Sequence, residues 1–237
     1  MIRTYLINIK SLEELNLDES IITPKRVETT ARYKNEPDKQ LSYCAELALI
    51  YGLKQLDPEM ALPLDIEVPE EGKPFLKTLP AGFENLYFNL SHSGDYAVAS
   101  ISDEEIGVDI EHVSKRGEMS ANRILHPDEN QIYNFISNPL EKKRYFYECW
   151  VSKESFLKNL GVGLMVRPDK FMINEDKLVT DETKTLKKRY VHIYSSEEVK
   201  RSDLKFHNFY RLAVCSMTKD PDATCEILTV DQLKAVI

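Results

Sequence analysis

The sequence predicts an α+β fold made of two similar halves, in each of which a helix is followed by antiparallel strands. Residues 37–53 and 142–160 carry apolar side chains at helical spacing, and a glycine stands near the end of each segment. Strand-like alternation follows both segments. The sequence AVAS at 97–100 recurs as AVCS at 213–216, which suggests two halves that meet near residue 105. Any two buried strands can share four such residues, so the repeat alone is weak support.

The other elements follow in chain order. Residues 57–82 hold five of the eleven prolines and are predicted to form a loop with one short extended piece at most. Strands are predicted at LYFNLSH, DYAVASIS and IGVDIEHV, and YAVASIS is expected to pair with IGVDIE as a hairpin. Further strands are predicted at KFMIN, RYVHIY and YRLAVCSM.

Composition limits the class of protein. The chain has 237 residues, 42% of them apolar, which suits one large domain or two small ones. A net charge of −8 disfavours a nucleic acid bound over a wide surface. The sequence shows no apolar signal segment and no run long enough to span a membrane, so a cytoplasmic protein is expected. Cys44, Cys149, Cys215 and Cys225 are scattered, which argues against a zinc site and a disulfide framework.

Two carboxylates stand on one face of the strand predicted at IGVDIE. Because strand side chains alternate, Asp109 and Glu111 share a face, and their Cα atoms lie roughly 6.5 to 7 Å apart. That spacing allows both to reach one hard cation, and Gly107 leaves room beside them. An ordinary amphipathic strand with its acidic side in water would show the same pattern, so the pair alone identifies no site.

The second predicted helix adds charge to an apolar stripe. Lys153 falls on that stripe, where a buried ammonium needs an anion unless its side chain extends to solvent. Glu154 and Lys158 stand one turn apart, as a simple i,i+4 pair on a solvated helix also would. Together with Asp109 and Glu111, the segment offers three carboxylates for a divalent cation and two lysines for phosphate oxygens. This combination favours phosphoryl chemistry with magnesium.

Two turns add candidate phosphate ligands. Ser91, His92 and Ser93 lie where a strand gives way to a turn, and their side chains can donate hydrogen bonds to phosphate oxygens. A second turn, EGKP, offers Lys73. Both have an ordinary structural explanation, because Ser, His and Gly are common at strand ends and GKP is a common turn.

Taken together and in order, EEGKPFL, FNLSHSGDYAVASIS, IGVDIE and FYECWVSKESFLKNLGVGL resemble the 4′-phosphopantetheinyl transferase superfamily, in its longer type that activates surfactin synthetase. The resemblance runs from about residue 70 to 170, and YRLAVCS extends it. It implies transfer of the phosphopantetheine arm of coenzyme A to a serine of an apo acyl or peptidyl carrier protein. It also implies a magnesium requirement, release of 3′,5′-ADP, and no nucleic-acid or membrane partner.

The resemblance further implies a monomer that is a pseudo-dimer with its active site between the halves. Residues 1–105 would form the coenzyme-binding half, and residues 106–237 the half that binds metal and carrier. The carrier would dock beside residues 159–190, although internal packing of their apolar side chains is an equally simple reading. Carriers of fatty-acid, polyketide, nonribosomal-peptide or siderophore synthesis are all compatible.

Matching positions then assign roles to individual residues. Asp109, Glu111 and Glu154 would be the magnesium ligands. Glu154 would also accept the proton of the incoming serine, and Lys158 would help the leaving group depart, with Lys153 nearby.

The same matching assigns the coenzyme-binding positions, which are Gly72, Lys73, Pro74, Ser91, His92, Lys153 and Lys158. Further upstream, Lys25 or Arg26 would meet the 3′-phosphate and Ser42 the nucleotide. The stretch KNEPDKQLSY lacks an arginine often found in the family, which puts recognition of the 3′-phosphate in question.

Two alternative functions stay open at this point. A metal-dependent nuclease also combines a D-x-E pair with a lysine-bearing helix, but the acidic net charge and the lack of a basic strip with aromatic residues argue against it. A coenzyme-binding or carrier-binding module without catalysis would keep the same fold. The three carboxylates and Lys158 count against that module.

Overall fold

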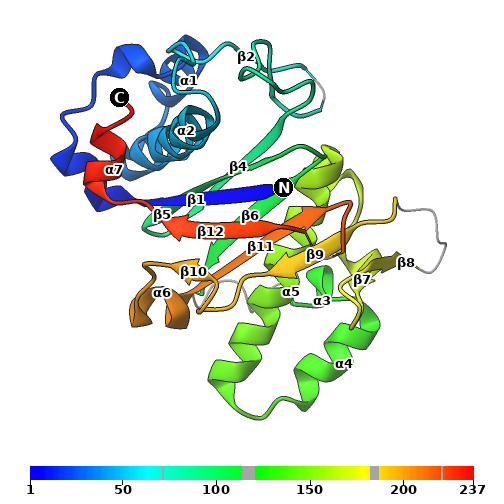
Figure 1. Ribbon diagram of the computed structural model, residues 1–237. Coiled ribbons are helices and arrows are strands. Elements are labelled where there is room, and N and C mark those ends of the chain that lie inside the picture. The colour runs from blue at the N-terminus through cyan, green and yellow to red at the C-terminus, as the bar shows by residue number, and fades with distance from the viewer. Residues whose placement is uncertain (71, 114–120, 182–186, 220) are drawn as a thin grey trace.

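The fold has four layers, with a long helix on each outer side and two β-sheets between them (Figure 1). The computed structural model describes residues 1–70, 72–113, 121–181, 187–219 and 221–237. The first sheet has the strand order β10-β12-β1-β5-β4, and the second has the order β6-β11-β9. The strands of the first sheet are β1 (Ile2–Asn8), β4 (Tyr87–Ser93), β5 (Tyr96–Ser102), β10 (Val199–Lys200) and β12 (Ala223–Ile227). Those of the second are β6 (Gly107–His112), β9 (Tyr190–Ile193) and β11 (Tyr210–Ser216).

The two halves share one topology. The helices α2 (Glu36–Leu56) and α5 (Pro139–Leu160) each follow the first strand of their half. In the first half, β5 lies between β1 and β4 and pairs antiparallel with both. In the second half, β11 lies between β6 and β9 in the same way. AVAS and AVCS stand on β5 and β11, the same strand of each half. The predicted α+β fold of two similar halves is therefore confirmed, while the boundary at residue 105 stays a prediction.

The sheets pack face to face because their strands alternate between two sides. Val108 and Ile110 of β6 belong to one buried cluster with Leu6 and Val98 of the first sheet. The other face of β6 is turned toward α5, where Asp109 meets a side chain of that helix. The sequence alternation of IGVDIE thus separates an apolar face from an acidic one.

The hairpin predicted between YAVASIS and IGVDIE is wrong. Both edges of β5 are taken, one by β1 and the other by β4, so β6 pairs with β11 in the second sheet. Strand β6 lies beside β4, but the two strands form no backbone ladder. Instead, side-chain oxygens of β4 accept hydrogen bonds from backbone N atoms of β6. Asn89 Oδ1 accepts a hydrogen bond from Val108 N (2.9 Å), and Ser93 Oγ accepts one from His112 N (3.0 Å).

The long helices follow the predicted spacing with different ends. The helix predicted over residues 37–53, with Gly52 near its end, continues in the structure to Leu56 as α2. A Cβ at Gly52 would lie 2.4 Å from Cδ1 of Ile101, so this glycine lets α2 lie close to the first sheet. Helix α5 ends as predicted at Gly161, which adopts a left-handed φ of 69°.

The remaining elements are short. The helices are α1 (Pro24–Thr30), α3 (Ala121–Ile124), α4 (Pro127–Phe135), α6 (Leu204–Phe209) and α7 (Val230–Lys234), and the paired short strands are β2 (Ile66–Glu67) with β3 (Phe75–Leu76) and β7 (Phe171–Ile173) with β8 (Val179–Asp181). The C-terminal segment returns to the first half, where β12 pairs parallel with β1 and Gln232 of α7 bonds Tyr51 of α2. Among the described helices, none combines the length and the apolar character needed to cross a bilayer.

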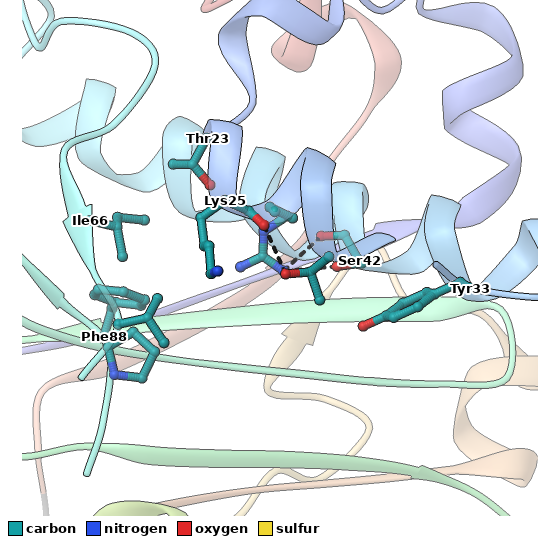
Figure 2. A pocket seen from close by; sticks show the side chains of 10 residues that line it. Thr23, Lys25, Tyr33, Ser42, Ile66 and Phe88 are labelled. Carbon is teal, nitrogen blue, oxygen red and sulfur yellow. Dashed lines mark hydrogen bonds between the residues drawn. The ribbon is translucent and has the colours of Figure 1, made fainter. Parts of the chain in front are cut away.

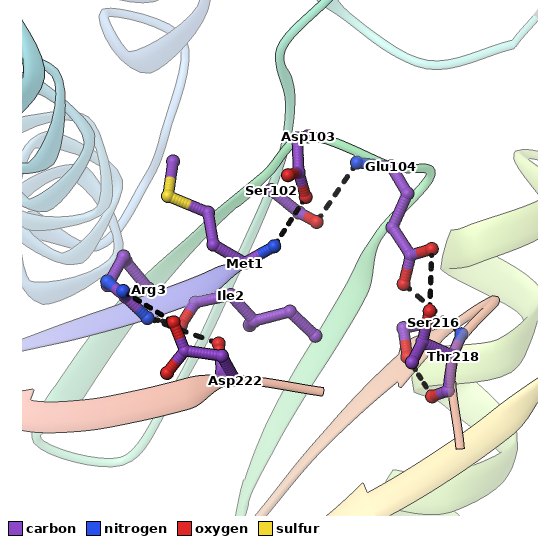
Figure 3. A network of polar contacts seen from close by, with 9 residues as sticks. All are labelled: Met1, Ile2, Arg3, Ser102, Asp103, Glu104, Ser216, Thr218 and Asp222. Atoms are coloured by element: carbon purple, nitrogen blue, oxygen red, sulfur yellow. Dashed lines mark hydrogen bonds and ion pairs between the residues drawn. The ribbon is translucent and has the colours of Figure 1, made fainter. Parts of the chain in front are cut away.

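A polar network joins the halves at the connection between β5 and β6 (Figure 3). The N-terminal ammonium donates to Asp103 Oδ1 (2.6 Å), and Glu104 accepts hydrogen bonds from the backbone N and the hydroxyl of Thr218. Arg3 holds Asp222, the residue that precedes β12. These contacts therefore connect residues 1–3, 103–104 and 218–222, which are far apart in the sequence.

Candidate active site

A cleft lies where α1 and α2 face strand β4 and the C-terminal part of α5. It consists of two adjoining cavities of about 240 Å³ and about 420 Å³. Both are lined by Arg26, Tyr33, Ser42, Pro74 and Phe88. The smaller cavity adds Lys25, which extends from α1 (Figure 2), and the larger adds Ser91, His92 and Lys158. The structure thus brings predicted coenzyme-binding residues from distant segments to one cleft.

A fully buried carboxylate organises the N-terminal wall of the cleft. Glu46 accepts hydrogen bonds from the Thr23 backbone N (2.7 Å) and from Arg26 Nε. Arg26 in turn donates from Nη1 to Ser42 Oγ (2.9 Å). From the sequence, Arg26 is predicted only as an alternative to Lys25, and Glu46 is not predicted at all. Its signal was a single acidic residue inside the apolar run of 41–53.

Helix α5 presents three polar side chains to β6. Trp150, Glu154 and Lys158 are spaced by four residues, so they share one face of the helix. Lys158 Nζ lies 2.6 Å from Oδ1 of the buried Asp109, and the same oxygen accepts a hydrogen bond from Ser91 Oγ (2.8 Å). The predicted carboxylate, lysine and serine therefore meet at the inner end of the cleft.

Glu111 is held from both sides by neutral donors. Its Oε2 accepts a hydrogen bond from Ser93 Oγ (2.9 Å), and its Oε1 accepts one from Trp150 Nε1 (3.0 Å). Burial, and then the charge of Asp109, raise the pKa of Glu111. In the sequence, Trp150 falls on the apolar stripe of the predicted helix, a position that gives no sign of this bond.

Glu154 faces the same carboxylates from α5. Burial, and then the charge of Asp109, raise the pKa of Glu154 to about 7, although Lys158 opposes that shift. Desolvated carboxylates that repel one another hold a proton more tightly than exposed ones. Glu154 is therefore poised to exchange a proton near neutral pH.

The carboxylates around Asp109 are the candidate ligands for a magnesium ion. In the parts of the chain that the structure describes, no three His, Cys, Asp or Glu side chains form a ready metal cluster. Asp109 Oδ2 is nevertheless buried and has no hydrogen-bond partner there. Magnesium commonly takes one or two protein carboxylates together with waters and substrate phosphates. An unpaired carboxylate oxygen beside two further carboxylates fits that requirement.

Replacing Trp150 by phenylalanine is expected to slow a reaction that depends on Glu111 by about three- to ten-fold. The change removes the donor to Glu111 Oε1, and one such bond contributes about 1 kcal/mol. The measurement is the rate under saturating substrate. Trp150 is the single tryptophan, so the variant has no tryptophan fluorescence, and circular dichroism is used to check its fold. An unchanged rate would show that the indole does not position Glu111.

Lys153 lies outside the cleft, which corrects its predicted contact with the coenzyme. Its side chain is fully buried, and its Nζ lies 2.7 Å from a carboxylate oxygen of Glu129 on α4. It also donates to the backbone oxygens of Pro168 (2.7 Å) and Phe171 (2.6 Å). Burial lowers the pKa of Lys153, while Glu129 opposes the shift. The anion that a buried ammonium requires is therefore supplied by the protein itself.

Lys73 and Gly72 also lie outside the set of residues that line the cleft. Lys73 Nζ donates to the backbone oxygens of Ile106 (2.5 Å) and Asn159 (3.5 Å). Gly72 is exposed and has a φ of 99°, a turn conformation that other residues rarely adopt. Pro74 alone of this turn reaches the cleft. Lys73 fastens the turn to the end of α5.

The buried position of Lys73 predicts a pH-dependent contribution to stability. Burial lowers its pKa from 10.5 to about 8. Between these values the unfolded chain binds a proton that the folded chain lacks, so this contribution to the unfolding free energy rises with pH. We expect a rise on the order of 2 to 3 kcal/mol, visible as the difference between wild type and Lys73→Met in urea unfolding at pH 8 and 10.

The exposed Lys77 supplies the control for that measurement. Lys77→Met makes the same chemical change at an exposed position, so the difference between the two variants isolates the effect of burying the side chain at residue 73. If the unfolding free energies of Lys73→Met and Lys77→Met differ by the same amount at pH 8 and pH 10, a desolvated ammonium at residue 73 is contradicted.

Two models of known protein families together match nearly the whole chain. Residues 10–104 match the family described as 4′-phosphopantetheinyl transferase, N-terminal, and residues 105–215 match the 4′-phosphopantetheinyl transferase superfamily. The chain is 31% identical to a 4′-phosphopantetheinyl transferase of Bacillus subtilis over 78% of this chain and 75% of that protein. It is 29% identical to 4′-phosphopantetheinyl transferase Sfp of Bacillus subtilis strain 168, over 69% of this chain and 70% of the relative.

More distant matches extend beyond bacilli. The mouse L-aminoadipate-semialdehyde dehydrogenase-phosphopantetheinyl transferase is 26% identical over 81% of this chain and 67% of its own. The solved holo-[acyl-carrier-protein] synthase of Thermotoga maritima overlaps 47% of this chain and 61% of its own, with a TM-score of 0.31 and 18% identity. The architecture described above rests on the strand pairing of the chain itself.

Proposed function

The chain belongs to the 4′-phosphopantetheinyl transferase superfamily, and we propose that it transfers the phosphopantetheine arm of coenzyme A to a serine of an apo acyl or peptidyl carrier protein. The observation that carries this proposal is the end of the cleft. There Ser91, Lys158 and Asp109 are joined by short hydrogen bonds, with Glu111 and Glu154 alongside. Donors for phosphate and acceptors for a cation meet at one point.

The cleft would hold the nucleotide end of the coenzyme. Lys25 and Arg26 supply positive charge at its outer part, and Ser42 is fixed beside them by Arg26. Nearer the carboxylates, His92 lines the wall, where burial and then the charge of Lys158 lower its pKa. A neutral imidazole there can donate one N–H to a phosphate oxygen.

Magnesium would be held by Asp109, Glu111 and Glu154. When bound, it supplies positive charge that neutralises the pyrophosphate of the coenzyme. The unpaired Oδ2 of Asp109 and the mutual repulsion of the carboxylates support this assignment.

The protein's own groups would manage the proton and the developing charge. The serine oxygen of the carrier forms a bond to phosphorus, the bond from that phosphorus to 3′,5′-ADP breaks, and Glu154 accepts the serine proton. A pKa of about 7 suits Glu154 to this exchange at neutral pH. Lys158, fixed by Asp109 and Ser91, donates toward the phosphate oxygens and stabilises the leaving group.

We further propose a cytoplasmic monomer that acts on coenzyme A and a carrier, with no nucleic acid or membrane involved. The four cysteines are free thiols, which suits a reducing compartment. The break between the two family matches supports a division of the chain into residues 1–105 and 106–237. The carrier would dock beside residues 159–190, of which 182–186 lie outside the described residues.

Intact-mass spectrometry tests the proposed reaction directly. A purified apo carrier incubated with this protein, coenzyme A and magnesium should gain the mass of one phosphopantetheine, and a chelator should prevent the gain. Coenzyme binding without any gain, over several acyl and peptidyl carriers, would instead support the binding module. Cleavage of DNA or RNA with magnesium would support the nuclease.

A further inference from the structure

A polar cavity of about 520 Å³ lies apart from the cleft, at the N-terminal half of α5. Its walls come from α5, from residues 193–196 at the end of β9, and from residues 206–208 and 210–212 of α6 and β11. It shares no lining residue with either cavity of the cleft. The proposed transfer reaction uses none of its residues.

Two guanidinium groups line this cavity with unused donors. Arg144 donates from Nη2 to Asn208 Oδ1 (3.0 Å), but its Nε is buried and has no partner in the described residues. Arg211 donates from Nε to Glu148 Oε1 (3.0 Å) and from Nη1 to the backbone oxygens of His207 (3.0 Å) and Tyr210 (2.6 Å). Within the described part of the chain, these bonds leave Nη2 of Arg211 unoccupied.

A histidine on the same wall has an unused ring nitrogen. His207 Nε2 lies 3.2 Å from Ser202 Oγ, while its Nδ1 is buried without a partner among the described residues. The Ser202 hydroxyl has one proton and donates it to the backbone oxygen of Val199 (2.6 Å), so Ser202 Oγ accepts from Nε2–H, and Nδ1 of the neutral ring carries a lone pair.

Such unpaired atoms are costly and uncommon, and each calls for a physical reason. Four buried side-chain atoms of the described residues lack a hydrogen bond, and two of them, Arg144 Nε and His207 Nδ1, belong to residues that line this cavity. A third, Asp109 Oδ2, stands where the proposed cation binds. Residues with unmet hydrogen-bonding capacity therefore border this cavity.

The charge of the cavity selects the sign of its ligand. Arg144 and Arg211 contribute two positive charges against the single carboxylate of Glu148. Burial lowers the pKa of Arg211, and the charge of Arg144 acts in the same direction. An anion between the two guanidinium groups would relieve that repulsion and accept hydrogen bonds from both.

We propose that this cavity binds an oxyanion, a phosphate or a carboxylate group, through the guanidinium groups of Arg144 and Arg211, with the ring of His207 on the same wall. The anion is either free in solution or carried on an acidic side chain of the acceptor protein. The second source is within reach because Arg211 stands opposite Glu111 in the β6–β11 ladder, one strand away from the proposed metal ligands. The binding itself requires neither coenzyme nor transfer.

Nuclear magnetic resonance of the arginine Nε–H and histidine ring signals tests the site. Inorganic phosphate is added to the protein without magnesium. The Arg211 and His207 signals are followed because they report on this cavity alone, whereas phosphate is also expected to bind in the cleft. These signals should shift with a saturable dependence on phosphate. Arg144→Gln should weaken that dependence by about ten-fold or more, and Arg144→Lys by less, because lysine keeps the charge and loses the planar fork.

The control is Arg123→Gln, which removes an exposed arginine of α3 and should leave the phosphate dependence unchanged. The second arm measures binding of an apo carrier by calorimetry, so that it needs no turnover. If phosphate has no effect but Arg144→Gln weakens carrier binding several-fold and Arg123→Gln does not, the anion belongs to the acceptor. No effect of either ligand at Arg211 and His207 in the folded wild type overturns the proposal, whether or not transfer occurs.

Discussion

Transfer of phosphopantetheine is expected to fall by about two to four orders of magnitude when Glu154 is replaced by glutamine, the range associated with loss of a general base. Glutamine keeps the size of the side chain but cannot accept the serine proton or contribute a negative charge to a cation. The rate of mass gain on the carrier, under saturating coenzyme and magnesium, is the measurement.

The same substitution should leave the fold intact. The ionised Glu154 is disfavoured in the folded state, since its pKa is raised to about 7. A neutral amide removes that cost above pH 7, so the variant should unfold at the same temperature as wild type or at a higher one. Loss of activity with full stability therefore distinguishes a chemical role from a structural one.

Glu141→Gln is the matched control for Glu154→Gln. It makes the same change on the first turn of the same helix, at an exposed position, and should leave the rate within about two-fold of wild type because surface substitutions have small effects. A Glu154→Gln enzyme that works at the wild-type rate would remove Glu154 both as the base and as a metal ligand.

Replacing Gly107 by alanine is expected to lower the unfolding free energy by about 3 to 5 kcal/mol, or to prevent recovery of folded protein. An added Cβ would lie 2.0 Å from the backbone oxygen of Ser155 and 2.4 Å from the backbone N of Asn159. Both atoms belong to α5 itself, so no side chain can turn aside. Urea unfolding followed by circular dichroism measures the change.

Gly82→Ala provides the comparison for Gly107→Ala. Gly82 has a φ of 86° and nothing within 4 Å of its added Cβ, so alanine there should cost only the backbone strain, about 1 kcal/mol. Equal stability of the two variants would contradict the close approach of β6 and α5. The sequence predicts that Gly107 leaves room beside the carboxylates, whereas in the structure the backbone of α5 fills that room.

Local patterns predicted most of the elements. The apolar spacing identified α2 and α5, and strand alternation correctly placed Asp109 and Glu111 on one face. Gly161 ends α5 because its left-handed conformation suits the end of a helix. Gly52 also stands near the end of an apolar run, but it lies within α2 and allows the helix to pack closely against the first sheet. A glycine at the end of an apolar run therefore does not reveal which of its two uses applies.

Long-range pairing explains what the sequence did not show. The partner of β6 is β11, about a hundred residues later, and the nearer β5 was chosen only because it was adjacent in the chain. The anion beside Lys153 is Glu129, on another helix, and the donor to Glu111 is Trp150. Each contact depends on how α4, α5 and β6 assemble, and no periodicity within one segment records that.

The parallel pairing of β1 with β12 has a consequence for synthesis of the chain on the ribosome. Residues 2–6 pair with residues 223–227, so one edge of the first strand lacks its partner until nearly the whole chain has been made. At about 5 to 20 residues per second, that wait is roughly 10 to 45 seconds. Throughout it, the nascent N-terminal sheet presents an open strand edge, the feature that chaperones shield and that aggregation exploits.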